Sequence, residues 1–215
     1  MGVSFGWGPA EARALAPGAA CVVVVDVLSF TTAVGVAVER GTAVYPYRWR
    51  DGTAAAYARE RDAVLAVGRR EATGEHPWSL SPAALRAAPV PPRLVLPSPN
   101  GSTIAAEAAG GGATVVAAGE RWPDGSLRPA LEDLLGAGAV LAALRAAGGR
   151  SLTPEATAAA TLWDATDDPA AALHGCDSGR ELYAYGCRRD VEVAAETDAS
   201  AVVPVLVDGA FQEAP

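Results

Sequence analysis

The chain has 215 residues, half of them hydrophobic, which is enough apolar material to bury a core without disulfide or metal staples. Its formal charge of −8 argues against a nucleic-acid partner, although a bound divalent cation would still let an acidic protein hold an anionic substrate. All 17 basic residues are arginine, so the chemistry of P-loop, Schiff-base and nucleophile-activating lysines is excluded.

The cysteines and the N-terminus indicate a cytoplasmic location. Cys21, Cys176 and Cys187 are odd in number and show no C-x-x-C spacing, so neither a disulfide framework nor a zinc ribbon is expected. The first residues lack the basic leader and apolar core of a signal peptide. No uncharged apolar stretch reaches the roughly 18 residues that a membrane span needs. We therefore expect a soluble cytoplasmic protein with no membrane partner.

Short apolar runs alternate with alanine-rich helical runs, which predicts an α/β fold with a largely parallel sheet. Strands are expected near Cys21–Val27, Thr42–Tyr47, Ala63–Val67, Arg93–Pro97, Ala113–Ala118, Asp190–Ala194 and Ala201–Val207. Helices are expected near Thr31–Arg40, Gly52–Arg61, Pro82–Ala88, Ser102–Ala109, Pro129–Ala147, Pro154–Trp163 and Ser178–Tyr185. We interpret residues 1–215 as a single domain with a subdomain edge near 147–153.

The first candidate site follows the apolar run that ends at Val25. Asp26 falls at the carboxyl end of a strand buried on both faces, where α/β sheets bind ligands. Ser29, Thr31 and Thr32 come next, at the start of a helix with unpaired N–H groups. This arrangement favours a metal ion beside a phosphate, and the alternative is that Asp26 merely ends the strand while a hydroxyl caps the helix.

The second candidate site is a strand that passes through a tight turn into a helix. The turn contains Asn100, the one asparagine of the chain, and continues with Gly101 and Ser102. A turn residue with a helix cap is the simpler interpretation. The functional interpretation is that two strand ends present hydroxyls and amides to one doubly charged anion.

The third candidate site combines Glu120 and Arg121, which follow a strand, with Glu132 and Asp133 at the start of a long helix. Acidic residues in a first helical turn are favoured by the helix dipole, so a purely structural role is a strong alternative. Adjacent helical residues point in different directions, so we expect one of Glu132 and Asp133 to reach the site directly.

Taken in order, these segments resemble the 2-phosphosulfolactate phosphatase family over most of the chain. The matching segments are Asp26-Val27-Leu28-Ser29-Phe30-Thr31-Thr32, Gly68-Arg69-Arg70-Glu71, Ser79-Leu80-Ser81-Pro82, Pro99-Asn100-Gly101-Ser102, Glu132-Asp133-Leu134-Leu135-Gly136-Ala137-Gly138, Asp177-Ser178-Gly179-Arg180-Glu181-Leu182, Asp190-Val191 and Val203-Pro204. The chain departs from the family pattern where Ser29-Phe30 replaces an arginine and where Leu80-Ser81-Pro82 replaces Asn-Ser-Pro.

The resemblance implies a three-layer α/β/α fold and a Mg²⁺-dependent phosphatase of the coenzyme M route. Its substrate would be 2-phospho-3-sulfolactate, a small anionic phosphorylated hydroxy acid, and its products would be 3-sulfolactate and phosphate. A homodimer is the default expectation for a soluble enzyme.

The chemistry of phosphate esters supports the same residues independently. Hydrolysis requires neutralisation of the phosphoryl oxygens and an activated nucleophile, and Mg²⁺ supplies both through oxygen ligands. The expected catalytic carboxylates are Asp26, Glu120, Glu132 and Asp133. The expected metal ligands are Asp26, Glu132, Asp133 and Asp190. The expected substrate contacts are Ser29, Thr31, Thr32, Arg69, Asn100, Gly101, Ser102 and Arg121, the two arginines by charge pairing.

Other functions share parts of this pattern. A haloacid-dehalogenase-type phosphatase needs a second aspartate two positions after the first, where this chain has Leu28. An isochorismatase-like hydrolase needs a catalytic lysine, which the chain lacks. A relative that binds a phosphorylated metabolite without turning it over, or a phosphatase of another small phosphomonoester, stays open.

Overall fold

The computed structural model of the chain describes residues 2–48, 51–107, 113–148 and 150–214. The strands are β1 (Val3–Trp7), β2 (Cys21–Val25), β3 (Ala43–Tyr47), β4 (Val64–Leu65), β5 (Arg93–Pro97), β6 (Ala113–Ala117), β7 (Glu120–Arg121), β8 (Leu127–Arg128), β9 (Pro204–Val207) and β10 (Ala210–Glu213). The helices are α1 (Gly8–Leu15), α2 (Phe30–Glu39), α3 (Gly52–Glu60), α4 (Pro82–Ala87), α5 (Gly101–Glu107), α6 (Leu131–Ala147), α7 (Pro154–Asp164), α8 (Pro169–Gly175), α9 (Asp177–Ala184) and α10 (Arg188–Ala194), with a 3₁₀ turn at Ala16–Gly18.

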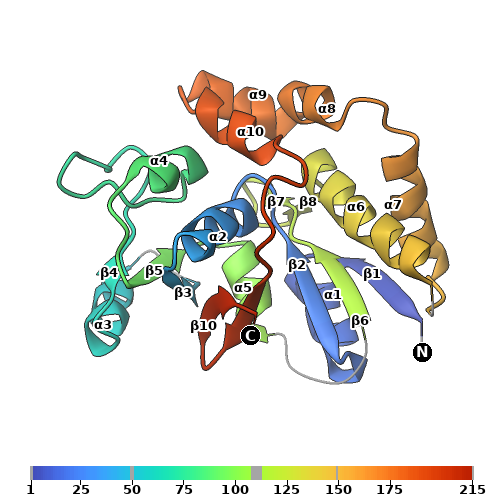
Figure 1. Ribbon diagram of the computed structural model, residues 1–215, viewed down its shortest axis with the longest axis horizontal. Helices are drawn as coiled ribbons and strands as arrows, with labels where there is room; N and C mark the ends of the chain where they lie inside the picture. The colour runs from blue at the N-terminus through green and yellow to red at the C-terminus, as the bar shows by residue number, and fades with distance from the viewer. Residues whose placement is uncertain (1, 49–50, 108–112, 149, 215) are drawn as a thin grey trace.

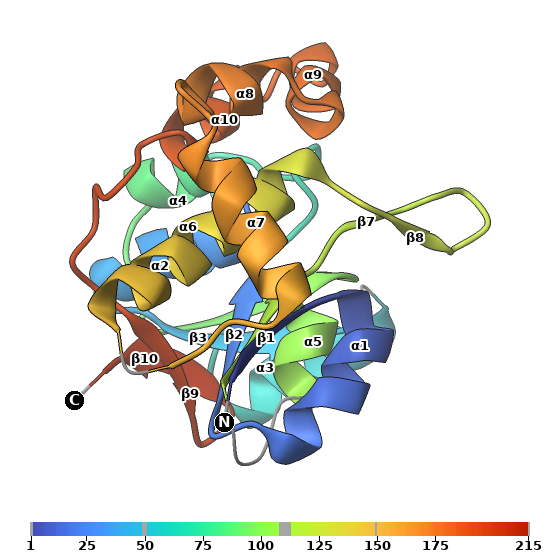
Figure 2. The ribbon, with the colours of Figure 1, turned by 90° about the vertical axis from the view of Figure 1, so that its right-hand side faces the viewer.

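The first sheet has the order β1-β6-β2, and all of its strand pairs are parallel. Helices α6 and α7 pack on one face of this sheet, and α1 and α5 contact its strands from the other side (Figures 1 and 2). The apolar run of β6 matches a parallel strand buried between helices. The burial on both faces predicted for the strand before Asp26 is wrong for most of β2, because β2 lies at the edge of the sheet, where Cys21 is exposed and Val25 alone is buried. The carboxyl ends of β2 and β6 meet at one edge, which carries Asp26 after β2 and Glu120 after β6.

The second sheet has the order β4-β5-β3-β10-β9. Its β3, β4 and β5 run parallel, whereas β10 pairs antiparallel with both β3 and β9. Helix α2 packs on β3, β9 and β10, α5 also contacts β3, and α3 contacts β4 and β5. The turn at Asn100 follows β5, so the second candidate site lies at the carboxyl ends of the parallel strands of this sheet.

Separate apolar clusters hold these layers together. Phe30, Val44, Leu94 and Leu96 are buried between α2 and the second sheet. The first sheet is joined to α6 and α7 by a buried apolar cluster of Val3, Val25, Val115, Ala117, Ala137, Leu141, Ala156, Ala159 and Ala160. Close packing of such side chains fixes the sheets relative to the helices and so fixes the loops between them.

Helices α8, α9 and α10 form a cap above the strand ends (Figure 1). The cap is attached by an apolar cluster that joins Leu28 and Leu135 to Leu173, Leu182 and Val191. Leu28 lies two residues after Asp26, so the underside of the cap adjoins the first candidate site. None of the described helices has the length and apolarity required to span a bilayer.

Local sequence signals explain where several helices begin. Ser81, Thr153 and Asp168 each accept a hydrogen bond at a helix start from a backbone N–H three residues later. Each of these caps is followed by proline, whose fixed φ suits the first helical position. These caps set the starts of α4, α7 and α8.

The predicted α/β class and three-layer arrangement are confirmed, and most predicted elements appear within a few residues of their expected bounds. The strand predicted at Asp190–Ala194 is wrong, because these residues belong to α10. The strands β1, β7, β8 and β10 and the helices α1 and α8 are absent from the prediction. The predicted end of α5 at Ala109 lies outside the described residues.

The predicted subdomain edge near 147–153 falls on the connection between α6 and α7. Ser151 accepts a hydrogen bond from Val3 (2.7 Å between N and O), and Thr153 donates one to Val3 (2.9 Å). This connection therefore pairs with the start of β1. The assignment of the whole chain to one domain stays a prediction.

Candidate active site

Asp26 lies at the meeting point of two helix starts. Its buried carboxylate accepts hydrogen bonds from the backbone N–H of Phe30 (Oδ1, 3.0 Å) and of Gly101 (Oδ2, 2.9 Å). Phe30 begins α2 after the first sheet, and Gly101 begins α5 after the second sheet. The carboxylate thus joins the first and second candidate sites, and the two amides donate to Asp26.

Asp133 makes a similar connection between the ends of β2 and β6. Its Oδ1 accepts a hydrogen bond from the Val27 N–H (2.7 Å), and its Oδ2 accepts one from the Gly119 N–H (2.8 Å). The side chain is buried in the first turn of α6. Asp133 therefore fixes the third candidate site against the loop that carries Asp26.

The carboxylates of this edge influence one another electrostatically. Burial raises the pKa of Asp26, and the nearby Glu132 raises it further, against the lowering effect of the two backbone hydrogen bonds and of Arg69. Burial also raises the pKa of Asp133 well above its ordinary value, with Asp26 and Glu132 adding to the rise. Such clusters of repelling carboxylates are frequent at functional sites.

Glu120 has a pKa raised to about 7, mainly by burial and then by the charges of Asp26 and Glu132. Its Oε2 accepts a hydrogen bond from the Asn100 amide (3.2 Å between Nδ2 and Oε2). The Asn100 amide oxygen in turn accepts one from Arg121 Nε (3.2 Å). The turn at Asn100 and the hairpin β7–β8 are therefore linked, which brings together residues predicted from two separate segments.

Glu132 borders a cavity of 310 Å³ between the start of α6 and the cap. The cavity is lined by Arg128, Pro129, Ala130, Leu131, Glu132, Gly175, Cys176, Asp177 and Ser178. Glu132 is almost fully buried, at 2% exposure. Burial, with the Glu132 charge beside it, raises the pKa of the Cys176 thiol to about 12, so this thiol stays protonated at neutral pH.

The sequence did not single out Cys176 or Arg128 as site residues. Arg128 forms a two-point ion pair with Glu181 of the cap (Nη1–Oε1, 2.7 Å; Nη2–Oε2, 3.1 Å), and its charge lowers the pKa of Glu120. Its buried Nε has no hydrogen-bond partner among the described residues. The sequence feature that could have indicated Arg128 is its position directly before Pro129 and the acidic start of α6.

The predicted hydroxyl groups lie in the expected loops, but several already hold the backbone. Thr31 donates to the Asp26 carbonyl (2.8 Å), and Thr32 donates to the Val27 carbonyl (2.8 Å). Ser102 is buried and donates to backbone carbonyls, among them that of Tyr47 (2.8 Å). Their contact with a phosphoryl group stays a prediction, because these hydroxyl protons are committed to the loop structure.

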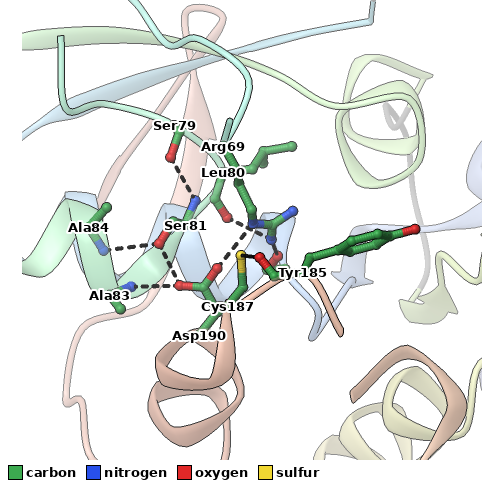
Figure 3. A network of polar contacts seen from close by, with 10 residues as sticks. Arg69, Ser79, Leu80, Ser81, Ala83, Ala84, Tyr185, Cys187 and Asp190 are labelled. Carbon is green, nitrogen blue, oxygen red and sulfur yellow. Dashed lines mark hydrogen bonds and ion pairs between the residues drawn. The ribbon is translucent and has the colours of Figure 1, made fainter. Parts of the chain in front are cut away.

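Arg69 and Asp190 form a separate ion pair between the loop after β4 and the cap (Figure 3). The Arg69 Nε lies 3.0 Å from Asp190 Oδ2, and Arg69 Nη2 also contacts the Ser29 hydroxyl. Arg69 therefore reaches the loop after Asp26, and its predicted pairing with an anionic substrate group stays a prediction. Asp190 lies on a helix rather than a strand, and tertiary packing of Val191 in the cap core explains the difference.

The described residues contain no group of three or more His, Cys, Asp and Glu side chains arranged to hold a metal ion. Mg²⁺ often takes one or two carboxylates and fills its other positions with water and substrate phosphate. The oxygen-rich, mutually repelling set around Asp26 fits this mode of binding. Asp190 differs from that set, because its oxygens face Arg69 and the start of α4.

Comparison with known proteins supports the resemblance in the second half of the chain. Residues 114–209 match the model of the 2-phosphosulpholactate phosphatase family. This segment contains Glu120, Glu132, Asp133 and Asp190, whereas Asp26 and Asn100 precede it. A search of curated proteins gave no significant match. The resemblance to the 2-phosphosulpholactate phosphatase family, a family of hydrolases, is thus confirmed over residues 114–209.

Proposed function

We propose that the protein is a Mg²⁺-dependent phosphatase of a small phosphorylated hydroxy acid. The leading candidate substrate is 2-phospho-3-sulfolactate, which would yield 3-sulfolactate and inorganic phosphate. The observation that carries this proposal is the electrostatic coupling of Asp26, Glu120, Glu132 and Asp133 at the carboxyl ends of parallel strands. Such a cluster has little structural benefit unless a cation or a proton balances it.

The donor set suits a hard cation. Asp26, with Glu132 or Asp133, would hold Mg²⁺, because each Asp26 and Asp133 oxygen accepts one backbone hydrogen bond and keeps a further lone pair. When bound, the ion would neutralise phosphoryl oxygens and lower the pKa of a coordinated water. The raised carboxyl pKa values support this role, since cation binding would favour the charged forms.

Glu120 is our candidate for proton transfer. Hydrolysis joins the oxygen of water to phosphorus and breaks the bond from phosphorus to the ester oxygen, which must then gain a proton. A carboxyl group with a pKa of about 7 is substantially protonated at neutral pH and can supply that proton. Its hydrogen bond with Asn100 would orient the carboxyl toward the loop that follows β5.

The anionic groups of the substrate would contact the two arginines. Arg121 is exposed beside Asn100, and Arg69 lies beside Ser29. Guanidinium groups pair with phosphate or sulfonate oxygens through two parallel hydrogen bonds. An enzyme that binds a substrate with two anionic groups would benefit from cations on both sides of the carboxylate cluster.

A substrate panel tests the proposal. Phosphate release is measured for phosphosulfolactate, phospholactate and phosphoglycerate, each with added Mg²⁺ and with a chelator. We expect Mg²⁺-dependent release with the highest kcat/KM for phosphosulfolactate. Release that is unaffected by the chelator would contradict the metal dependence. Tight binding of all three compounds without release would favour a non-catalytic relative that binds a phosphorylated metabolite.

A further inference from the structure

The carboxylate of Asp190 connects three parts of the chain. It lies in the first turn of α10, its side chain is 2% exposed, and its Oδ2 pairs with Arg69 Nε at 3.0 Å. Its Oδ1 accepts hydrogen bonds from the Ser81 hydroxyl and from the Ala83 N–H (3.3 Å) at the start of α4. Figure 3 shows the carboxylate between the Arg69 guanidinium and the α4 start. Each oxygen of this buried carboxylate therefore accepts at least one hydrogen bond, and Oδ2 also pairs with a cation.

The guanidinium of Arg69 is held in one orientation by its partners. Its Nε donates to Asp190, and its Nη2 donates to the Ser29 hydroxyl and to the Leu80 carbonyl (3.0 Å). The described residues offer no hydrogen-bond partner to its Nη1, and a quarter of the side chain is exposed. The Arg69 charge also lowers the pKa of Asp26, so the guanidinium lies within electrostatic reach of the Asp26 carboxylate.

We propose that Asp190 is a positioning residue, which fixes the Arg69 guanidinium so that its free Nη1 faces the anionic group of the substrate. This role replaces the metal ligation predicted for Asp190 from the sequence. The inference rests on the proposed function insofar as the anion is a phosphorylated substrate. Because α10 supplies Asp190 and the loop after β4 supplies Arg69, the cap takes part in substrate recognition without touching the reacting atoms.

A structural explanation competes with this one, because Asp190 also supports the start of α4. The chain offers a variant that separates the two roles. Ser81→Ala removes the hydroxyl donor to Asp190 Oδ1 and the cap of α4, but leaves the Arg69 ion pair intact. Asp190→Asn weakens the ion pair and keeps the side-chain volume.

The test combines equilibrium binding with kinetics. The Kd for inorganic phosphate is measured by calorimetry, and KM and kcat are measured with the best substrate of the panel, for wild type, Asp190→Asn, Ser81→Ala, Arg69→Gln and the double variant Asp190→Asn/Arg69→Gln. We expect Asp190→Asn to raise Kd and KM about tenfold and to change kcat less than about threefold, because a misoriented cation weakens anion binding. Ser81→Ala is expected to leave Kd and KM near wild type.

The double variant gives the sharpest readout. If Asp190 acts through Arg69, Asp190→Asn has no further effect on Kd once Arg69 is Gln. Equal losses of affinity in Ser81→Ala and Asp190→Asn, or additive effects in the double variant, would overturn the inference.

A substitute variant and the use of Kd keep the test informative if Asp190→Asn does not fold or if the wild type has no activity. Should Asp190→Asn fail to fold, Asp190→Glu keeps the charge but shifts the carboxylate by one methylene, and an unchanged Kd in that variant would also overturn the inference. Because Kd needs no turnover, a wild type that binds phosphate but hydrolyses nothing contradicts the proposed phosphatase alone.

Discussion

The carboxylate of Asp26 accepts a hydrogen bond from the backbone N–H of Gly101, 75 residues away in the chain, at 2.9 Å. Asp26 follows β2 of the first sheet and Gly101 follows β5 of the second, so this contact joins the edges of both sheets at which these strands end. The N–H belongs to the first residue of α5, where the helix dipole favours a negative charge. The contact therefore fixes the central carboxylate at a site suited to phosphate chemistry.

Gly101→Ala is expected to disrupt this contact. A Cβ at Gly101 would lie 2.5 Å from Phe30 Cδ1 and 2.7 Å from Asp26 Oδ2, so the Asp26 side chain or the α5 start must move. We expect a loss of about 1–3 kcal/mol in the free energy of unfolding, as for overpacked cores, together with lower phosphatase activity. Thermal unfolding and phosphate release measure the two effects.

The matched control is Gly52→Ala, since Gly52 is also the first residue of a helix but a Cβ there would have no neighbour within 4 Å among the described residues. That variant is expected to be neutral or slightly stabilising. If the two alanine variants behave alike, the close approach of Gly101 to Asp26 has no functional importance.

Glu120→Gln is expected to remove the proton donor while it preserves the shape of the side chain. The wild-type rate should fall as pH rises through about 7, because the Glu120 carboxyl loses its proton there. The variant should be slower by about 10²–10⁴-fold below that pH and should lack this alkaline limb. Glu155→Gln on α7 provides an exposed control. An unchanged pH profile in Glu120→Gln would exclude Glu120 as the acid.

The stability of the metal-free protein is expected to decrease as pH rises from about 5 to about 8. Burial raises the pKa of Asp26, Asp133 and Glu120 in the folded state, whereas the unfolded chain keeps ordinary values near 4. Between those values the folded state binds more protons than the unfolded state, so each increase in pH favours unfolding. Glu181 and Glu196 have lowered pKa values and act in the opposite direction, but at more acidic pH.

Thermal unfolding with a chelator and with Mg²⁺ measures this dependence. Mg²⁺ should raise the Tm more at about pH 8 than at about pH 5, because it binds the charged carboxylates of the folded state. A Tm that increases with pH in the presence of chelator would show that burial does not raise the pKa values of these carboxyl groups.

The main features of the site could be predicted because they depend on short local patterns. A valine run that ends in Asp26 indicates a buried strand with a carboxylate at its end, and an acidic pair before an apolar run indicates the start of α6. Parallel strands then bring such residues to one edge without further information. For this reason Asp26, Asn100, Glu120 and Asp133 were expected together and are found together.

The other features of the site depend on tertiary contacts that cannot be predicted from short patterns in one sequence. The alternation of Val191 and Val193 fits a strand, but burial of Val191 in the cap core stabilises a helix, so Asp190 meets Arg69 instead of the other carboxylates. The hydroxyls of Thr31 and Ser102 have the right positions for anion contacts, yet they donate to backbone carbonyls in their loops. Such choices between partners are decided by tertiary packing.

The most direct test of the central claim is phosphate release from a generic aryl phosphate by wild type and Asp26→Asn, each with Mg²⁺ and with a chelator. Asp51→Asn, which changes an exposed helix cap, is the control for the substitution itself. We predict Mg²⁺-dependent turnover in wild type and in the control, and a loss of at least about 100-fold in Asp26→Asn, as for removal of one strong electrostatic contact in an active site. Turnover in Asp26→Asn equal to wild type, or turnover that persists in the chelator, would contradict the claim that this carboxylate cluster performs metal-dependent hydrolysis.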